Sequence, residues 1–443
     1  MRPSLSAIAK TVGAIISPEH VFALADQAVV SGTSFLTTLL IARWSSSSQL
    51  GVYAVGISLL LSVQTFQESL ILEPFIIQRH YQDGTPAERA GASLLLSFLF
   101  AGASIVILTA VATSFLSWAG GSEMIAMTFA VAAVLPFALA REFARRFSFA
   151  HHLFRHAFFL DLAVALIQLL TLSWLGVSGR MSALSAAAAL GSACAVTAGA
   201  WLYRTRAEFA VRVKHLGTVL KQTWTLGKWL LAGRITLQVQ GYVTYWISII
   251  IAGAAVTGIY TACFSIVAFA NPLLIGLNNS FFPRAVSAWK SGGGPALWRE
   301  AIRNTVLIAV LMTAFTLAVL LAGEHVMRFL YHGAEYEGHG QMLTVLALAL
   351  FAGAVAAPPS FALATMERPR PIVTTGVFGA GITVALIWVL MMRWGLLGAA
   401  YGLLGGSAAG SVARWIAFYL VVTANRSYRT PSSLARVVSV RDV

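Results

Sequence analysis

Four polar side chains in the middle of the chain have the spacing of one helix face. Arg234 is followed at intervals of three or four residues by Gln238, Tyr242 and Tyr245, and residues at these intervals lie on the same side of an α-helix. A guanidinium binds phosphate through two parallel hydrogen bonds, an amide reaches hydroxyl groups, and an aromatic ring stacks on a sugar. The pattern therefore favours a binding surface for a sugar phosphate. The alternative is that Arg234 is a buried ion-pair partner of an acidic residue.

Three other charged residues, Asp26, Glu68 and Arg414, interrupt long apolar runs. A charge at the centre of a bilayer costs about 2.5–3.5 kcal/mol, so such residues usually face a protein interior or a wet cavity. A carboxylate in a wet cavity can bind H⁺ or Na⁺, which makes Asp26 and Glu68 candidates for an ion-coupling site. The alternatives are a helix-terminal role for Asp26, a structural hydrogen bond for Glu68, and pairing of either one with Arg234. Arg414 is a second, weaker candidate for phosphate binding, the alternative being that it pairs or extends to the membrane surface.

A basic stretch, Arg141–His156, follows one of the apolar runs. It has the composition to gather a lipid pyrophosphate, but basic loops on the cytoplasmic side are general in membrane proteins and explain it without a binding function. We therefore interpret this stretch as a topological signal. Asp161, a few residues beyond it, is expected to pair with Arg155 or His156.

The elements that must position these residues follow from hydropathy. Of the 443 residues, 58% are hydrophobic and 10% are charged, against about 25% charged in an ordinary soluble domain. This composition excludes a typical soluble enzyme, a disordered chain and a disulfide scaffold. The net charge of +14 comes from basic residues scattered through short loops, so we expect no nucleic-acid partner.

A spanning helix needs about 20 apolar residues. The chain contains twelve such runs: 21–41, 51–75, 91–116, 122–140, 157–177, 182–202, 229–252, 256–281, 304–322, 341–364, 371–391 and 396–422.

The basic residues also give the expected topology. With a cytoplasmic N-terminus, 24 of the 30 Lys and Arg residues fall on the inner side and four in outer loops, as the positive-inside rule describes. We expect an all-α polytopic membrane protein with both termini cytoplasmic. Its predicted parts are a cytoplasmic tail or surface helix at 1–20, a six-helix bundle at 21–203, a basic linker at 204–228, a second six-helix bundle at 229–422 and a cytoplasmic tail at 423–443.

The two predicted bundles resemble each other near the start of their second spans. The tripeptides Gly51–Tyr53 and Gly258–Tyr260 are 207 residues apart. Because six is an even number of crossings, both halves enter the membrane from the same side, which makes a parallel repeat. Transporters commonly place their substrate at the interface between such repeats.

Six stretches along the chain carry a family likeness: Ala25–Gln27, Leu40–Trp44, Gly51–Tyr53, Glu142–Arg146, Glu367–Arg370 and Gly395–Gly402. In these stretches the chain resembles bacterial polysaccharide flippases of the multidrug/oligosaccharidyl-lipid/polysaccharide exporter superfamily, and the resemblance covers nearly the whole sequence. It implies two six-helix bundles around a central cavity that opens alternately to each side of the bacterial inner membrane. It also implies a cargo of undecaprenyl-pyrophosphate-linked oligosaccharide. The multidrug branch carries a coupling carboxylate in its first span, a position that Asp26 matches.

The function predicted on this basis is a flippase that moves a lipid-linked oligosaccharide or polysaccharide precursor by alternating access, with Na⁺ or H⁺ as the coupling ion. A multidrug or cation antiporter of the same fold is the alternative, which the two intramembrane acids keep open. A membrane-embedded polysaccharide polymerase or ligase is disfavoured because no outer loop exceeds about twenty residues. We expect no catalytic residue, metal or organic cofactor. The expected partners are the cargo, membrane lipids and the polysaccharide polymerase machinery.

Overall fold

The computed structural model describes residues 18–77, 85–116, 121–210, 216–331 and 333–424, and every regular element in these ranges is helical. The elements in chain order are α2 (Pro18–Trp44), α3 (Ser47–Gln67), η1 (Glu68–Leu72), α4 (Glu73–Ile77), α5 (Pro86–Val111), η3 (Ala112–Leu116), α7 (Ser122–Ala150), α8 (Phe154–Val177), α9 (Ala183–Thr205), η4 (Arg206–Glu208), α10 (Leu216–Ile251), α11 (Gly253–Val267), η6 (Ala268–Ala270), α12 (Asn271–Leu330), η7 (Ala334–Tyr336), α13 (Gly340–Ala354), α14 (Ala357–Thr365) and α15 (Pro369–Ala424). The turns η1 and η3 are π-helical, and the other η turns are 3-10. The predicted terminal segments 1–20 and 423–443 lie almost entirely outside the described residues.

Within the described residues, eight helical segments are long and apolar enough to cross a membrane. Two of them far exceed the roughly 17–25 residues that one crossing needs, because Gly253–Leu330 contains 78 residues and Pro369–Ala424 contains 56. Each includes a glycine in left-handed backbone, Gly293 with φ 58° and Gly395 with φ 57°, a conformation that strains residues with a side chain. Each long segment therefore contains two helices that meet at a kink.

Capping side chains fix where two of the helices begin. At the start of α5, the hydroxyl of Thr85 accepts a hydrogen bond from the backbone N–H of Glu88 at 3.3 Å, and the Glu88 carboxylate accepts one from the backbone N–H of Thr85 at 3.2 Å. Ser182 and Ser185 form the same reciprocal pair at the start of α9. Such capping boxes satisfy backbone donors that have no partner inside the helix.

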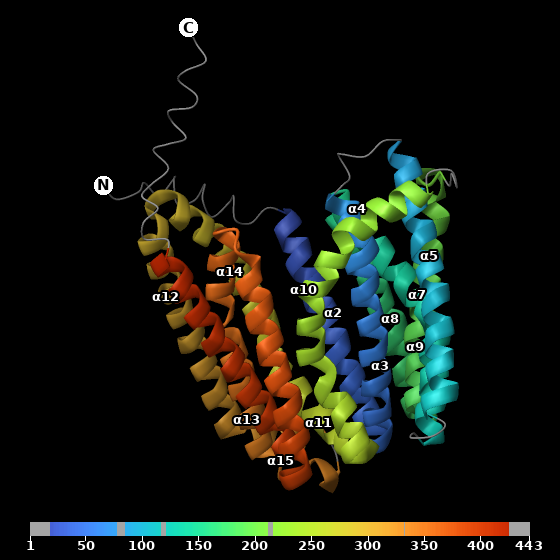
Figure 1. The fold of residues 1–443 in the computed structure, drawn as a ribbon. Coiled ribbons are helices and arrows are strands. Elements are labelled where there is room, and N and C mark those ends of the chain that lie inside the picture. The colour runs from blue at the N-terminus through green and yellow to red at the C-terminus, as the bar shows by residue number, and fades with distance from the viewer. Residues whose placement is uncertain (1–17, 78–84, 117–120, 211–215, 332, 425–443) are drawn as a thin grey trace. The chain divides into compact units, whose positions relative to one another are not determined.

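The chain divides into two compact units, residues 1–235 with 252–262 and residues 236–251 with 263–443. In the first unit, α7 packs against α9, α5 and α3, and α8 packs against α2 and α9. Figure 1 shows these helices running side by side. Aromatic side chains fill the core near the C-terminal end of α7 and include Phe143, Phe147, Trp201 and Phe209. This packing orients α7, which carries four charged side chains of the site, Arg141, Glu142, Arg145 and Arg146.

Two glycines bring α3 and α11 into backbone contact within the first unit. A Cβ atom on Gly51 would lie 1.9 Å from the carbonyl oxygen of Ala254, and a Cβ atom on Gly258 would lie 1.9 Å from the carbonyl oxygen of Ser47. Small residues at such crossings let membrane helices approach closely. A separation of 207 residues relates Gly51 to Gly258 and also Ser47 to Ala254. The contact is therefore reciprocal, since corresponding positions of the two Gly-x-Tyr regions supply both of its sides.

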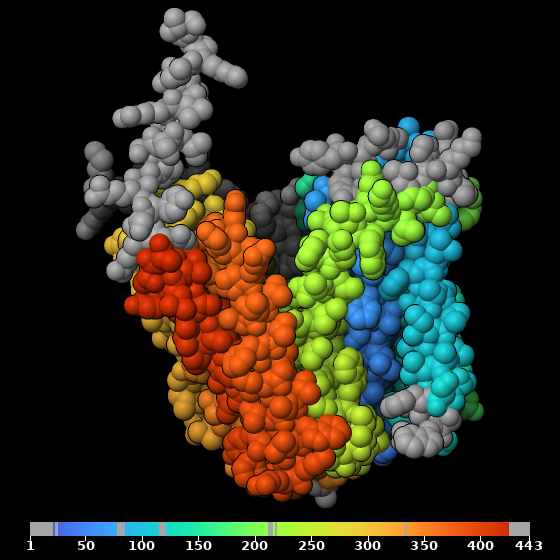
Figure 2. Space-filling model, in the orientation of Figure 1, coloured from blue at the N-terminus to red at the C-terminus, as the bar shows by residue number. Residues whose placement is uncertain are grey.

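The two halves of α15 in the second unit are antiparallel and pack on glycines. The close approaches pair Gly398 with Leu390, Gly402 with Ile387, Gly406 with Thr383 and Gly410 with Gly379. Because one partner advances along the chain while the other recedes, these contacts define a hairpin that turns at Gly395. A glycine at every fourth position lets the two backbones come close. The side chains of α15, orange to red, cover much of the face of this unit that Figure 2 presents.

Two helices extend beyond the apolar runs predicted for them. α7 continues ten residues past position 140, and α10 begins 13 residues before position 229, inside the predicted basic linker. Charged residues end the hydropathy signal in both places. The arginines of α7 are paired with acids from other elements.

Candidate functional site

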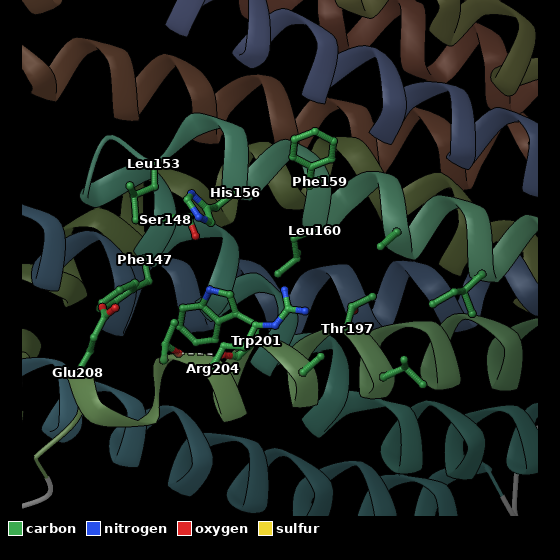
Figure 3. Close-up of a pocket in the computed structure, with 15 residues that line it drawn as sticks. Phe147, Ser148, Leu153, His156, Phe159, Leu160, Thr197, Trp201, Arg204 and Glu208 are labelled. Carbon is green, nitrogen blue, oxygen red and sulfur yellow. Dashed lines mark hydrogen bonds between the residues drawn. The ribbon is translucent and has the colours of Figure 1, made fainter.

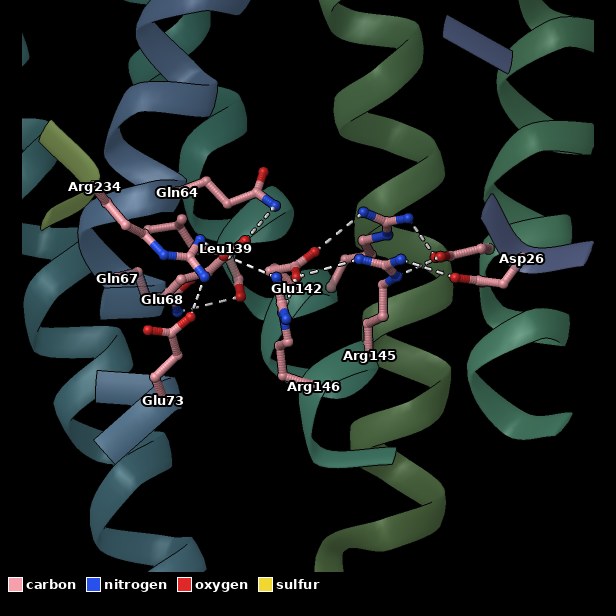
Figure 4. Close-up of polar contacts among 12 residues, drawn as sticks. Asp26, Gln64, Gln67, Glu68, Glu73, Leu139, Glu142, Arg145, Arg146 and Arg234 are labelled. Carbon is pink, nitrogen blue, oxygen red and sulfur yellow. Dashed lines mark hydrogen bonds and ion pairs between the residues drawn. The ribbon is translucent and has the colours of Figure 1, made fainter. Parts of the chain in front are cut away.

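Nine charged side chains meet inside the first unit. We call them the charged cluster: the carboxylates are Asp26, Glu68, Glu73, Glu142 and Asp161, and the guanidiniums are Arg141, Arg145, Arg146 and Arg234. They come from α2, η1, α4, α7, α8 and α10. Figure 4 shows Glu142 in the middle of the cluster, with Asp26 on one side and Arg234, Glu68 and Glu73 on the other.

Glu142 of α7 is the centre of the cluster, and its side chain is fully buried. Its Oε1 accepts a hydrogen bond from Nε of Arg146 at 2.8 Å and lies 3.6 Å from Nη1 of Arg145, while its Oε2 lies 3.4 Å from Nη1 of Arg141. Intervals of three and four residues place Arg145 and Arg146 on the Glu142 side of the helix. One carboxylate thus holds together three guanidiniums of its own helix.

Arg145 joins this centre to α2 and α8. Its Nη2 donates to Oδ2 of Asp26 at 2.8 Å, and its Nε lies 2.8 Å from Oδ2 of Asp161. Arg141 also pairs with Asp161. The prediction that Asp161 pairs with Arg155 or His156 is therefore wrong. The guanidinium of Arg155 instead lies over the ring of Phe22, 5.6 Å from its centroid.

Glu68 and Glu73 connect the cluster to α10. Oε2 of Glu68 accepts hydrogen bonds from Nη2 of Arg146 at 2.8 Å and from Nη1 of Arg234 at 3.0 Å, and Arg234 also pairs with Glu73. Glu68 begins the π-helical turn η1, a wider turn that is often found at functional sites. Gly227 lets α10 pack on this turn, because a Cβ there would lie 2.8 Å from Cα of Leu70.

The charges in the cluster do not balance. Five carboxylates face four guanidiniums, so the cluster carries one net negative charge when all nine groups are ionised. Asp26 is 1% exposed, and its Oδ1 accepts no hydrogen bond from the described residues. A buried acceptor without a donor is unfavourable. The chemistry that this arrangement allows is the binding of one proton or one monovalent cation.

The predicted polar stripe lies along α10 as the sequence suggested, but its members have different surroundings. Arg234 forms ion pairs with Glu68 and Glu73, which is the arrangement given above as the alternative to phosphate binding. Tyr245 is buried, with its ring centroid 6.4 Å from that of Phe264 in an edge-on contact. Tyr242 lies 6.4 Å from Tyr245 between centroids. Sugar contact by Gln238, Tyr242 and Tyr245 stays a prediction.

Arg414, in the second unit, has neutral hydrogen-bond partners. Its Nε donates to the hydroxyl of Thr375 at 3.1 Å, its Nη1 to the hydroxyl of Ser360 at 3.2 Å, and its Nη2 to the carbonyl oxygen of Ile372 at 3.3 Å. In the part of the chain that the structure describes, it forms no ion pair. Gly376 leaves room for it, because a Cβ there would lie 3.2 Å from Nη2 of Arg414. Among the described residues, no acid neutralises the charge of this guanidinium.

Sequence reasoning missed the centre of the site. Arg141, Arg145 and Arg146 were assigned to a basic loop, and this is wrong, because they are helical and pair with buried acids. For Glu142 the sequence predicted no ion-pair partner. The available signal was the Glu-x-x-Arg-Arg spacing of 142–146, which gives ion pairs at three and four residues on a helix.

Replacing Arg234 should show what its ion pairs contribute. We expect Arg234→Gln to lower stability by about 1–3 kcal/mol, because it leaves Glu73 without its charged partner. Adding Glu73→Gln to the same chain should restore most of the loss. The measurement is the thermal midpoint of purified protein in one detergent. A double variant no more stable than Arg234→Gln would contradict the pairing.

Several solved structures share this architecture. One is an inward-facing multidrug resistance MATE family transporter of the MOP superfamily, with a TM-score of 0.68, 15% identity, and coverage of 94% of this chain and 97% of that chain. Another is the lipid II flippase MurJ in an inward closed conformation, with a TM-score of 0.68, 12% identity and coverage of 91% and 90%. The chain has the fold of the MOP superfamily transporters.

A third similar structure is a MOP superfamily transporter from Pyrococcus furiosus. The binding pocket of that transporter has reverse polarity, which suggests that its function is different. It has a TM-score of 0.62 and 12% identity, and the match covers 91% of this chain and 94% of that chain. No protein-family profile and no curated protein matches the chain. The likeness to the MOP fold extends over nearly the whole length of the chain. Together with the eight apolar helical segments in the described residues, this fold indicates a polytopic membrane protein.

Proposed function

We propose that the protein is a transporter that moves a lipid-linked oligosaccharide from the cytoplasmic to the outer leaflet of the bacterial inner membrane by alternating access. The fold shared with a MATE transporter and with lipid II flippase MurJ supports a transport function. The proposal includes twelve spans in two parallel six-helix bundles. In support, two of the eight apolar segments contain two helices each, and α2 and α10 have 27 and 36 residues. The reciprocal contact of Gly51 and Gly258 supports the repeat.

The observation that carries the choice of cargo is the environment of Arg414. Its three hydrogen-bond acceptors are neutral, so its positive charge is available to an anion. A guanidinium binds phosphate oxygens with two parallel hydrogen bonds, and a lipid pyrophosphate supplies such oxygens. Arg234, the stronger candidate from sequence, has its charge neutralised by Glu68 and Glu73. In this proposal Arg414 is the main contact for the anionic group of the cargo.

The charged cluster supports ion coupling. Its one excess carboxylate, and the Oδ1 of Asp26 that accepts no hydrogen bond from the described residues, give a place for one H⁺ or for one Na⁺. A ligand shifts a conformational equilibrium only when it binds the two states differently. Neutralising Asp26 would weaken the ion pair that links α2 to Arg145 of α7, and so provides that difference.

A multidrug or cation antiporter is the second candidate. The excess carboxylate in the charged cluster is the observation that favours it, because a cationic drug and a proton would compete for one negative charge. The same fold in a multidrug resistance MATE family transporter is consistent with this function. The two functions differ in the charge of the cargo. An anionic lipid-linked cargo would contact Arg414, and a cationic drug would contact an acid of the charged cluster.

Gene deletion followed by complementation tests the proposal. We expect deletion to remove surface polysaccharide and to accumulate lipid-linked repeat units, and the unaltered gene to reverse both effects. Arg414→Gln should lower export by about 10- to 150-fold, since a hydrogen bond to a charged group contributes about 1.5–3 kcal/mol. Arg414→Lys should restore part of it, because lysine keeps the charge without the planar fork.

Arg393→Gln is the matched control, because Arg393 is an exposed arginine in the other half of α15, before the turn at Gly395. It should export normally at equal membrane abundance. Normal polysaccharide after deletion, together with new sensitivity to cationic drugs, would favour the antiporter instead. Interaction with polysaccharide polymerase machinery is part of the proposal and can be assayed by co-purification from the same strain.

A further inference from the structure

A groove runs between α8 and α9 on the first unit and has a volume of about 620 Å³. This size lies within the roughly 300–1,000 Å³ typical of small-molecule sites. Its walls are mostly apolar and include Leu160, Ile167, Val196 and Trp201. Figure 3 shows these helices lining the groove from both sides. Asp161, next to Leu160 in sequence, belongs to the charged cluster, but none of the nine residues of that cluster lines the groove.

One end of this α8–α9 groove is polar. Arg204, His156 and Glu208 lie there, and Figure 3 shows Arg204 and Glu208 on opposite sides of the Trp201 ring. In the described part of the chain, neither Arg204 nor Glu208 forms an ion pair. The groove therefore offers one positive and one negative group, separated by an aromatic face.

The length of the groove corresponds to one leaflet. From His156 to Ile167 the helix rises about 16 Å, at about 1.5 Å per residue, and half of the hydrocarbon core is about 15 Å thick. An apolar channel with polar groups at one end matches a molecule with a hydrocarbon tail and a polar head. The walls belong to spanning helices, so lipid is the molecule that reaches them.

We propose that the α8–α9 groove is a binding site for one phosphatidylethanolamine molecule of the adjoining leaflet. Its phosphate contacts Arg204 and His156, its ammonium contacts Glu208, and one acyl chain lies along Leu160 and Ile167. The pair of opposite charges selects this head group, because phosphatidylglycerol has no ammonium for Glu208. The quaternary ammonium of phosphatidylcholine has no N–H to donate to a carboxylate.

Lipid retention tests this site. Purified protein is placed in bilayer discs of equal parts phosphatidylethanolamine, phosphatidylglycerol and phosphatidylcholine, extracted gently, and the bound lipid is identified by native mass spectrometry. We expect one retained phosphatidylethanolamine per chain. Arg204→Gln should lower its retention about tenfold, as expected for loss of a hydrogen bond to a charged group. Val196→Trp, which fills the groove from an exposed position, should abolish retention.

Glu208→Gln separates the head-group contacts. It should remove the preference for phosphatidylethanolamine over phosphatidylglycerol while keeping phosphate binding. Arg206→Gln is the matched control, because Arg206 is exposed, lies outside the groove and stacks on Tyr203 with its guanidinium carbon 4.7 Å from the ring centroid. Equal retention of all three lipids, or retention unaffected by Arg204→Gln and Val196→Trp, would overturn the proposal.

Discussion

Glu142→Gln is expected to leave little folded protein in the membrane. The Glu142 side chain is fully buried and contacts the guanidiniums of Arg141, Arg145 and Arg146. Removing its charge takes away the one carboxylate that lies between three guanidiniums of the same helix, which then keep only their partners on other elements. Breaking a buried ion pair from one side costs about 3–5 kcal/mol. This loss is a large fraction of the stability of a typical protein, which is about 5–15 kcal/mol. Fluorescence-detected size exclusion of tagged protein measures the folded fraction.

Glu123→Gln makes the matched comparison on the same helix. Glu123 is exposed in the first turn of α7, where it accepts a hydrogen bond from Gln49 at 3.2 Å. A surface substitution of this kind usually changes stability by less than about 0.5 kcal/mol. Similar yields and thermal midpoints for the two variants would show that the cluster is not what holds α7 in place.

Asp26→Asn should make transport independent of the coupling gradient. Asp26 is the buried acid whose Oδ1 has no donor among the described residues, and the amide cannot take up a proton or replace the charge that a cation needs. A pH gradient of one unit corresponds to about 1.4 kcal/mol and about a tenfold ratio of accumulated substrate. We expect this ratio to disappear in proteoliposomes, while exchange without a gradient continues.

Glu68→Gln is the companion variant, since Glu68 is the other acid predicted from the sequence to bind the coupling ion. Glu123→Gln again serves as the exposed control and should keep the full gradient response. Parallel assays with a Na⁺ gradient and a pH gradient identify the ion. An unchanged response to both gradients in Asp26→Asn and Glu68→Gln would exclude the charged cluster as the coupling site.

The helical architecture could be predicted because it depends on local composition. Runs of about 20 apolar residues must form helices in a bilayer, where backbone groups have no water to bond. The positions of Asp26, Glu68 and Arg234 inside such runs also marked them as paired or functional. In the structure all three belong to the charged cluster.

The connections inside the cluster could not be predicted, because they depend on distant parts of the chain. Arg145 and Asp26 are 119 residues apart, and Arg234 and Glu68 are 166 apart. Hydropathy ended the fourth span at residue 140, since it counts Arg141 and Glu142 as polar whether or not they are paired. The π-helical turn at Glu68 has no signal in composition either.

The contact between Gly51 and Gly258 makes one sequence motif serve as both faces of an interface. Gly51 of α3 leaves room for the backbone of α11 at Ala254, and Gly258 of α11 leaves room for the backbone of α3 at Ser47. Residues at matching positions therefore supply both sides of the contact. In an assembly of two identical chains, this self-complementary geometry is called isologous. A substitution such as Gly51→Val breaks the crossing even though Gly258 is intact, because the added atoms meet the carbonyl oxygen of Ala254. We therefore expect both copies of the motif to keep their glycine, even where the rest of the two halves differ in sequence.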